Sequence, residues 1–287
     1  MNPSKKPRMR EEDANMVINI EDDFSLDAIA DSGQCFRWHL NSDGSYYIIS
    51  KGKLLKAQQD KHSKSIHLDC SEEDFRCFWN EYFDLDTSYQ KIRAIVPPSD
   101  GFLFSAAQQE TGIRILHQDV WEMLITFIIS QRKSIPAIKK AVEAVCERSG
   151  EPLVLQDGTK MYSFPTPEAL SNLSLEDLKQ CGLGYRSRYV YEVAQTIAHN
   201  AFNLQAIEKF DDDTLFKLLQ TLTGVGKKVA NCVMLFGYHR LNAFPQDVWI
   251  NRILDDKYPN GFSFDAYKPY NGVMQQYMFE YYRRTSK

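Results

Sequence analysis

The sequence predicts an α+β protein in which a small N-terminal antiparallel β-sheet domain precedes a larger all-helical domain. Segments typical of strands are confined to roughly the first 70 residues, whereas almost all apolar residues after Gly101 recur with a helical period. The turn-forming run Pro97-Pro98-Ser99-Asp100-Gly101 separates the two parts. We therefore expect a disordered basic tail over residues 1–15, the β domain over 16–98 and the helical domain over 99–287.

In the β domain, residues 36–40 and 46–49 are rich in aromatic and β-branched side chains, and the turn signal Asn-Ser-Asp-Gly joins them. This pattern predicts a β-hairpin, and residues 66–68 predict a further strand. Ser71 precedes three acidic residues and opens a predicted helix. The apolar positions of that helix are Phe75, Phe78, Trp79 and Tyr82.

In the helical domain, start signals mark the expected helices. Asp119 precedes an apolar helix that runs to about Ile128, and Pro136 opens a second one. Three more helices are predicted from the N-cap candidates Thr166, Ser174 and Asp211.

The composition excludes several classes of protein. The chain is 43% hydrophobic and 25% charged, which is typical of a globular protein. No apolar run reaches the roughly 18–20 residues of a membrane span, and residues 1–15 lack the apolar segment of a signal peptide. The six cysteines are scattered without a C-x-x-C pair, which argues against a zinc ribbon or an iron–sulfur loop. We therefore expect a protein with reduced thiols that is neither secreted nor inserted in a membrane.

The net charge is −4, but basic residues are concentrated in three windows, over residues 123–142, 178–191 and 214–246. These windows contain Lys and Arg but no Asp or Glu. Solvated helix faces would explain any one of them. All three together favour a surface that attracts a polyanion.

The most informative segment is 222–230, Leu-Thr-Gly-Val-Gly-Lys-Lys-Val-Ala. One helix is expected to end at Leu222 and another to begin directly after the turn formed by Gly224 and Gly226. Glycines allow a tight turn, and the amides that open the second helix then form a site suited to a phosphate. An ordinary helical hairpin is the alternative for this pattern taken alone.

This segment resembles the helix-hairpin-helix of the DNA glycosylase superfamily whose hairpin is followed by a Gly/Pro-rich loop and an aspartate. The sequence supplies Phe-Pro-Gln-Asp-Val at 244–248, which puts Asp247 nineteen positions after Lys228. Segments 32–38, 182–189 and 269–279 resemble, in order, signatures of the 8-oxoguanine DNA glycosylase branch. The resemblance implies a bifunctional DNA N-glycosylase and abasic-site lyase that excises 8-oxoguanine from duplex DNA by base flipping.

The resemblance places the chemistry on two residues. Lys228 would be the nucleophile that forms an imine with the opened sugar, an intermediate that permits strand cleavage by β-elimination. The motif alignment leaves the adjacent Lys227 to bind a phosphate. Asp247 would stabilise positive charge on the sugar and orient the lysine, and it also suits the N-cap of the following helix.

The resemblance also implies a pocket for the extruded base. The Gly33 carbonyl would accept a hydrogen bond from N7–H of 8-oxoguanine, a hydrogen that normal guanine lacks. Phe279 and Cys232 would sandwich the base, and Gln275 would read its pairing edge. The expected pocket is completed by Phe236 and Pro245.

On the DNA-binding face, Tyr185 would wedge into the duplex and Arg186 would contact the orphaned base. Here the sequence departs from the animal and plant branch, which has an asparagine where Arg132 stands and an arginine where Ala137 stands. A strict demand for cytosine opposite the lesion is therefore not expected. The remaining predicted DNA contacts are Arg132, Arg188, Gly224, Gly226 and Lys227.

No organic cofactor is implied. The backbone carbonyls of Gln220, Leu222 and Val225 are expected to hold a structural monovalent or calcium ion at the hairpin. The expected partner is double-stranded DNA containing 8-oxoguanine, bound by a monomer in the nucleoid of a bacterium or the nucleus of a eukaryote. Two alternatives remain open: a glycosylase for another damaged, alkylated purine, which usually lacks the lysine, and a non-catalytic helix-hairpin-helix DNA-binding protein.

Overall fold

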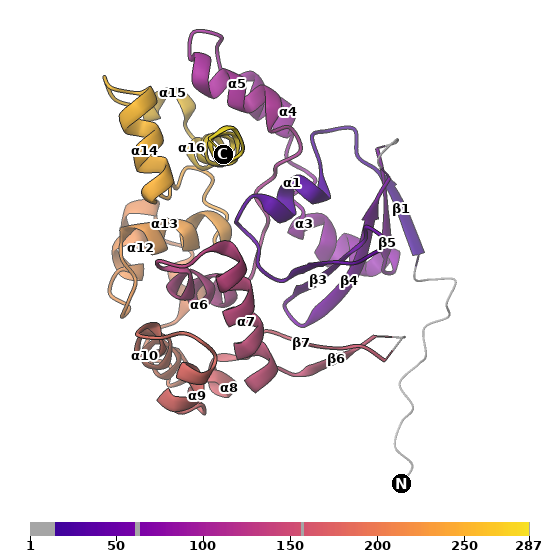
Figure 1. Cartoon of the computed structure of the whole chain (residues 1–287), viewed down its shortest axis with the longest axis vertical. Coiled ribbons are helices and arrows are strands. Elements are labelled where there is room, and N and C mark those ends of the chain that lie inside the picture. The colour runs from indigo at the N-terminus through magenta and orange to yellow at the C-terminus, as the bar shows by residue number, and fades with distance from the viewer. Residues whose placement is uncertain (1–14, 61–63, 156–157, 287) are drawn as a thin grey trace.

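The computed structural model describes residues 15–60, 64–155 and 158–286. An N-terminal sheet lies on one side of the molecule and a body of helices lies on the other (Figure 1). This is the α+β class predicted from the sequence. The predicted tail lies outside the described residues, except that Asn15 already belongs to the first strand. No helix among the described residues is long and apolar enough to cross a membrane.

The N-terminal sheet has five antiparallel strands in the order β1-β5-β4-β3-β2. The predicted hairpin is confirmed as β2 and β3, with Trp38 opposite Ile48, and the predicted third strand is β5. The strands β1 and β4 complete the sheet, and their bounds were not predicted. The strands are β1 Asn15–Asn19, β2 Trp38–Leu40, β3 Tyr46–Ser50, β4 Lys53–Gln59 and β5 Ser65–Asp69.

Short helices cover the sheet and lead into the helical body. Ser71 caps the helical segment that follows β5, as predicted, and this segment contains a π-helical turn over Phe75–Trp79. Helix α1 is capped by Ser25 and was not predicted. The helices of this part are α1 Leu26–Asp31, α2 Glu72–Asp74, α3 Asn80–Tyr82, α4 Tyr89–Ala94 and α5 Gly101–Gln109.

The helical body begins where predicted. Asp119, Thr166, Ser174 and Asp211 each accept a hydrogen bond from a backbone N–H in the first turn of the helix that follows. The helices are α6 Val120–Ser130, α7 Ile135–Ser149, α8 Pro167–Ser171, α9 Leu175–Gln180, α10 Arg186–Ala198, α11 Leu204–Ile207, α12 Asp212–Leu219, α13 Lys227–Phe236, α14 Val248–Lys257, α15 Phe264–Tyr267 and α16 Asn271–Thr285. A small hairpin, β6 Pro152–Val154 and β7 Lys160–Tyr162, interrupts the helices and was not predicted.

The two hydrophobic cores interleave across the predicted domain boundary. Tyr89, Ile92 and Val96 lie before residue 99 but pack in the larger, helical core. Leu116 lies after it but packs in the core under the sheet. The boundary at 98/99 therefore stays a prediction, since the chain crosses between the cores more than once.

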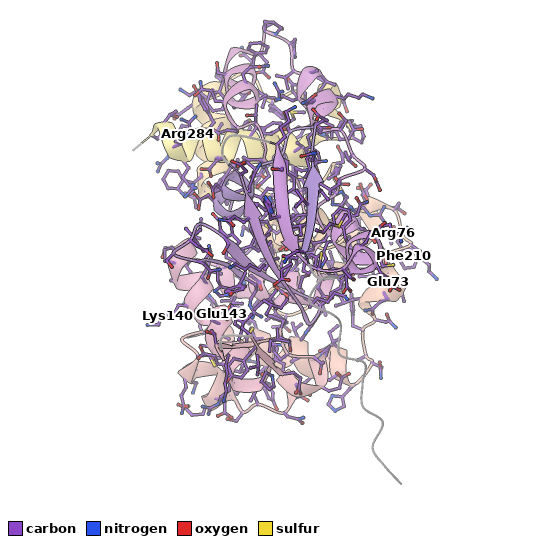
Figure 2. The ribbon with its side chains drawn as sticks, turned by 90° about the vertical axis from the view of Figure 1, so that its right-hand side faces the viewer. Glu73, Arg76, Lys140, Glu143, Phe210 and Arg284 are labelled. Carbon is purple, nitrogen blue, oxygen red and sulfur yellow. The ribbon has the colours of Figure 1, made fainter. Side chains whose placement is uncertain are left out.

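A buried arginine joins the two parts. Arg37 is 1% exposed, and its guanidinium contacts Glu143 of α7 at 2.6 Å and donates to the Cys146 sulfur. Figure 2 shows Glu143 and, on the C-terminal helix α16, Arg284. Arg284 pairs with Glu110 at 2.8 Å, directly after α5. The Arg37 contacts hold α7 against the N-terminal part, and Arg284 ties α16 to the end of α5. Residues of α16 line the site described next.

Candidate active site

The predicted hairpin connects α12 to α13. Gly224 has φ +79°, and a Cβ there would lie 2.7 Å from the Tyr189 ring, so both the turn and its packing require glycine. Gly226 is the N-cap of α13, which places Lys227 and Lys228 in the first turn of that helix. Lys227 is exposed, whereas Lys228 is half-buried. The two adjacent lysines therefore have different environments, as the assignment of Lys228 as nucleophile and Lys227 as phosphate ligand requires.

The Lys228 amine is held by α6. Its Nζ donates to Ser130 Oγ at 3.2 Å and lies 4.9 Å from the centre of the Phe127 ring. Ser130 Oγ in turn donates to the Phe127 carbonyl at 2.8 Å. Because the hydroxyl proton is committed to that carbonyl, Ser130 can only accept from the lysine. The Ser130 hydroxyl and the Phe127 ring together fix the position of the Lys228 amine.

Asp247 caps α14. Its Oδ1 accepts a hydrogen bond from the Ile250 N–H at 2.9 Å, which is the N-cap role expected for it. The second carboxylate oxygen accepts no hydrogen bond from the described residues, so the carboxylate can face the site while it caps the helix. The structural and the catalytic role of Asp247 are thus geometrically compatible.

Lys228 and Asp247 meet in one cavity. It has a volume of about 50 Å³, and its walls include all eight residues predicted for catalysis and base recognition. These eight are Gly33, Lys228, Cys232, Phe236, Pro245, Asp247, Gln275 and Phe279. They come from four separate segments of the chain, which the fold alone brings together.

The cavity is too small for a base in this structure. A cavity of about 50 Å³ holds one or two waters, not a purine. The Phe279 ring lies over Gly33: a Cβ on Gly33, which has φ +75°, would be 3.5 Å from that ring. A base can therefore lie between Phe279 and Cys232 only if the phenylalanine ring moves.

The inner wall of the cavity is neutral. Burial raises the pKa of the Cys232 thiol to about 11, although the neighbouring Lys228 acts in the opposite direction. Gln275 is 4% exposed, and its Oε1 accepts from Gln276 Nε2 at 2.9 Å. That bond fixes the Gln275 amide, so its NH₂ group remains as the donor that it can present to a base.

A larger cleft of about 700 Å³ opens from this cavity. The two share Gly33, Phe127, Lys228, Asp247 and Phe279. The cleft is further lined by side chains suited to DNA, which include Arg132, Lys133, Gln246, Trp249, Asn251 and Arg283. Arg132 is exposed and has φ +52°, a conformation that asparagine adopts more readily than arginine.

The predicted wedge is exposed, but the neighbouring arginine is not. Tyr185 is 53% exposed, as an intercalating side chain requires, whereas Arg186 is 6% exposed. The Arg186 guanidinium donates to the carbonyls of Gln131 and Leu183 and stacks 4.4 Å from the Tyr185 ring. Arg186 thus positions the wedge here, and its contact with an orphaned base stays a prediction.

Two further predicted DNA-binding features can be located. Arg188 is exposed and pairs with Glu192 at 2.6 Å, so a phosphate would compete with that carboxylate. At the hairpin, the Leu222 carbonyl accepts a hydrogen bond from the Val225 N–H at 3.1 Å and keeps a second lone pair. Backbone oxygens are ligands that calcium accepts, so the Leu222 carbonyl is a suitable ligand, and the ion itself stays a prediction.

Sequence reasoning did not identify four residues of the site. Ser32 and Gln276 line the cavity beside predicted residues, so adjacency was the available signal. Phe127 was expected only as an apolar position of α6, and Ser130 carried no signal. Their approach to Lys228 depends on the packing of α6 against α13, which no local pattern encodes.

Comparison with known proteins is decisive for the family. Residues 16–124 match the 8-oxoguanine DNA glycosylase N-terminal domain, and residues 125–260 match the HhH-GPD superfamily of base excision DNA repair proteins. The N-glycosylase/DNA lyase of Saccharomyces cerevisiae is 30% identical over 269 residues, 85% of this chain and 70% of that protein. The chain belongs to the 8-oxoguanine DNA glycosylase family.

Solved structures of relatives extend this likeness to the whole fold. A structure of MBOgg1 with a low-affinity DNA ligand has a TM-score of 0.90 and 32% identity over 99% of this chain and all of that one. The Clostridium acetobutylicum 8-oxoguanine glycosylase/lyase, bound to double-stranded DNA with cytosine opposite 8-oxoG, gives 0.85 and 32% over 96% of this chain and all of that one. This glycosylase therefore shares its architecture with relatives that have been seen on DNA.

Proposed function

We propose that this glycosylase excises 8-oxoguanine from double-stranded DNA and then cleaves the strand at the resulting abasic site. The observation that carries the proposal is the single cavity in which a half-buried lysine, an aspartate and the expected base-reading residues meet. A DNA-binding module without catalysis would have no use for that arrangement. The family names of the relatives support the same activity.

The reaction begins at the Lys228 amine. Its lone pair attacks C1′ of the damaged nucleotide, the glycosidic bond breaks, and the electron pair of that bond leaves with the base. Opening of the sugar gives an imine between Nζ and C1′, and loss of a C2′ proton then expels the 3′ phosphate by β-elimination. Asp247 at the rim of the cavity stabilises the positive charge that develops on the sugar.

Recognition of the lesion is proposed to rest on Gly33. A backbone carbonyl aimed at N7 pairs with the N7–H of 8-oxoguanine but meets the lone pair of guanine. An unpaired polar contact in a dry pocket costs about 1–3 kcal/mol, enough to disfavour the normal base. The positive φ of Gly33 allows its backbone to lie directly under the Phe279 ring, where the base would stack.

The proposal also includes the oligomeric state, the cellular location and a bound ion. The enzyme acts as a monomer on duplex DNA, in the nucleoid of a bacterium or the nucleus of a eukaryote, without an organic cofactor. Carbonyls of Gln220, Leu222 and Val225 would hold a monovalent or calcium ion, which supplies positive charge next to a DNA phosphate. The exposed Lys227 lies at the same hairpin and would bind the phosphate from the protein side.

Borohydride trapping on a duplex containing 8-oxoguanine tests the chemistry. We expect covalent capture of the wild-type protein and of Lys227→Gln, and none of Lys228→Gln, because reduction requires the imine on Lys228. Lys228→Gln should still bind the duplex, and a thermal melt checks that each variant is folded. A trapped adduct with Lys228→Gln would identify Lys227 as the nucleophile. If neither the wild type nor either variant is trapped, the lyase mechanism is contradicted.

A further inference from the structure

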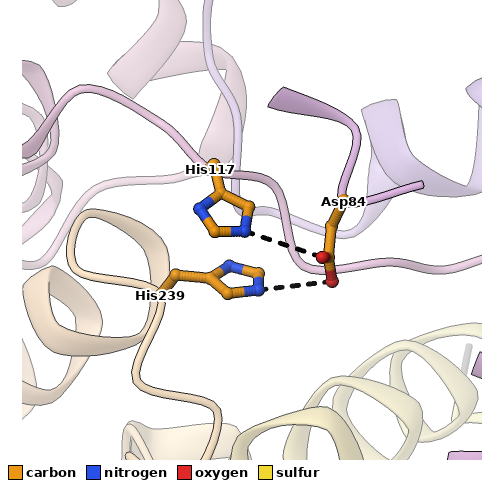
Figure 3. A group of neighbouring side chains, drawn as sticks. All are labelled: Asp84, His117 and His239. Carbon is orange, nitrogen blue, oxygen red and sulfur yellow. Dashed lines mark ion pairs between the residues drawn. The ribbon is translucent and has the colours of Figure 1, made fainter. Parts of the chain in front are cut away.

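Three side chains of metal-ligating type that do not line the cavity meet where three segments of the chain come together (Figure 3). Asp84 lies in the turn after α3, His117 in the connection between α5 and α6, and His239 in the turn after α13. Nε2 of His117 lies 3.6 Å from Asp84 Oδ1, and Nε2 of His239 lies 3.2 Å from Asp84 Oδ2. Both rings thus face one carboxylate from the same side.

Backbone hydrogen bonds fix these segments to one another. The His117 N–H donates to the Tyr82 carbonyl at 3.0 Å, which ties the connection to the end of α3. The next residue, Gln118, donates to the Phe236 carbonyl at the end of α13. Backbone hydrogen bonds therefore hold the segments that carry the cluster in place.

The carboxylate itself is oriented by two hydroxyls. Tyr89 donates to Oδ2 and Thr87 to Oδ1 of Asp84, each at 2.8 Å. Outer hydrogen bonds of this kind are typical of carboxylates that ligate a metal. The nearby Arg114 donates to the main-chain carbonyl of Asp84 and not to its carboxylate.

Two observations indicate that the cluster is under constraint. Asp84 and His239 both have φ +52°, a backbone conformation that costs a non-glycine residue free energy and persists only where the surroundings impose it. Nδ1 and Nε2 of His239 are buried, and neither makes a hydrogen bond of normal geometry with the described residues. The group that faces Nε2 of His239 is the Asp84 carboxylate at 3.2 Å, and a cation placed between the nitrogen and the carboxylate would engage both.

We propose that Asp84, His117 and His239 bind one divalent transition-metal ion, with Zn²⁺ the best fit. Two zinc ligands at about 2.0–2.1 Å from the metal in a tetrahedral arrangement are roughly 3.3 Å apart. Nε2 of His239 lies 3.2 Å from Oδ2 and Nε2 of His117 lies 3.6 Å from Oδ1, so each ring stands at about that spacing from one oxygen of Asp84. A single ion would bind both oxygens or draw the two rings toward one of them. Two imidazoles and a carboxylate leave a fourth position for water, on the side of His117, which is 30% exposed.

Metal binding requires one change in the cluster. The rings of His117 and His239 are stacked, with centres 3.4 Å apart and planes at 20°, so their Nε2 lone pairs run nearly parallel. They converge on one ion only if the rings splay. The His239 side chain is 13% exposed and that of His117 is 30% exposed, so the more exposed His117 ring is the one that turns.

The bound ion would link two segments that are distant in the sequence. It would join the turn after α3, beside the sheet, to the turn that ends α13, the helix that carries Lys228. Because the unfolded chain lacks this constellation, the ion stabilises the folded state. At a metal concentration 100-fold above Kd, we expect Tm to rise by about 5–10 °C.

The test uses the full chain after treatment with EDTA. Titration with Zn²⁺ should show one bound equivalent together with the rise in Tm. Titration with Co²⁺ should give the visible absorption of a tetrahedral nitrogen and oxygen site, without a thiolate-to-cobalt band. His117→Ala should abolish all three signals, and so should Asp84→Asn if that variant folds.

His67→Ala is the matched control, since His67 is an exposed histidine on β5 outside the cluster, and it should behave as the wild type. The proposal is overturned if the wild type binds no stoichiometric metal, since the histidines would then form only a stacked pair. It is also overturned if His117→Ala binds as tightly as the wild type. Loss of binding in His67→Ala would place the metal at another site.

Discussion

The double role of Asp247 can be separated by two substitutions of the same residue. The Oδ1 atom accepts from the Ile250 N–H at 2.9 Å, and asparagine keeps such an oxygen while it removes the charge. Alanine removes both. Loss of an N-cap costs about 1 kcal/mol, and loss of a negative charge at a helix N-terminus costs about 0.3–1 kcal/mol.

These values predict different stabilities but similar losses of activity. Asp247→Ala should lower the free energy of unfolding by about 1.5 kcal/mol and Asp247→Asn by about 0.5 kcal/mol. For a chain of this size, 1 kcal/mol corresponds to about 2–4 °C in Tm, so the losses are about 3–6 °C and 1–2 °C. Both variants should lose roughly 10²–10⁴-fold in the single-turnover rate of base release, because both lack the carboxylate.

Melting curves and single-turnover excision on an 8-oxoguanine duplex measure the two effects. Asp211→Ala serves as the control, because Asp211 caps α12 through a bond of 2.9 Å to the Thr214 N–H and lies outside the cavity. It should lose stability and keep the excision rate. Equal losses of Tm in the two Asp247 variants would refute the capping argument, and a wild-type rate in Asp247→Asn would refute the catalytic one.

Four further outcomes are expected. Affinity for DNA should fall steeply with salt concentration despite the net charge of −4, and a flat plot of log affinity against log salt would contradict the basic surface. Since Arg132 and Ala137 replace two expected readers of cytosine, 8-oxoguanine opposite adenine or thymine should be excised at rates closer to those opposite cytosine than in the animal enzymes. Excision measured with all four opposite bases tests this, and a cytosine preference of several hundred-fold would refute it. Ser130→Ala should slow imine formation and shift its pH–rate profile while duplex binding is unchanged, whereas Ser130→Thr should restore it. Burial raises the pKa of Glu122 from 4.5 to about 8, so the folded state holds a proton that the unfolded chain has lost, and stability should fall as the pH rises through that window. Glu122→Gln should flatten this slope in urea denaturation, and an unchanged slope would assign it to other groups.

The sequence predicted the cavity better than the sheet. The residues of the cavity were predicted because the segments that contain them resemble, in order, the signatures of a known family. β4 was missed because its sequence, Lys-Leu-Leu-Lys-Ala-Gln-Gln, does not alternate strictly between apolar and polar residues. The strands β6 and β7 have three residues each, too few for a periodic pattern.

Contacts between distant segments escaped prediction for a different reason. The hydroxyl of Ser130 reaches Lys228 only because α6 packs on α13, and the buried Arg186 reaches the Gln131 carbonyl only because α10 packs beside α6. Such contacts depend on how the helices pack against one another. A residue that the sequence pattern predicts to be exposed can therefore be buried in the structure. Arg186 is the example, because the family resemblance predicted a DNA contact for it and its side chain is 6% exposed in the structure.

The small volume of the cavity also has a pharmacological consequence. A ligand that binds only the open state has an apparent affinity reduced by the fraction of molecules that are open. Free purine analogues should therefore bind this protein weakly, since each must first displace the Phe279 ring from Gly33. Compounds that occupy the adjoining cleft of about 700 Å³, or that lock the ring in its present position, avoid that cost and are the better starting point for an inhibitor.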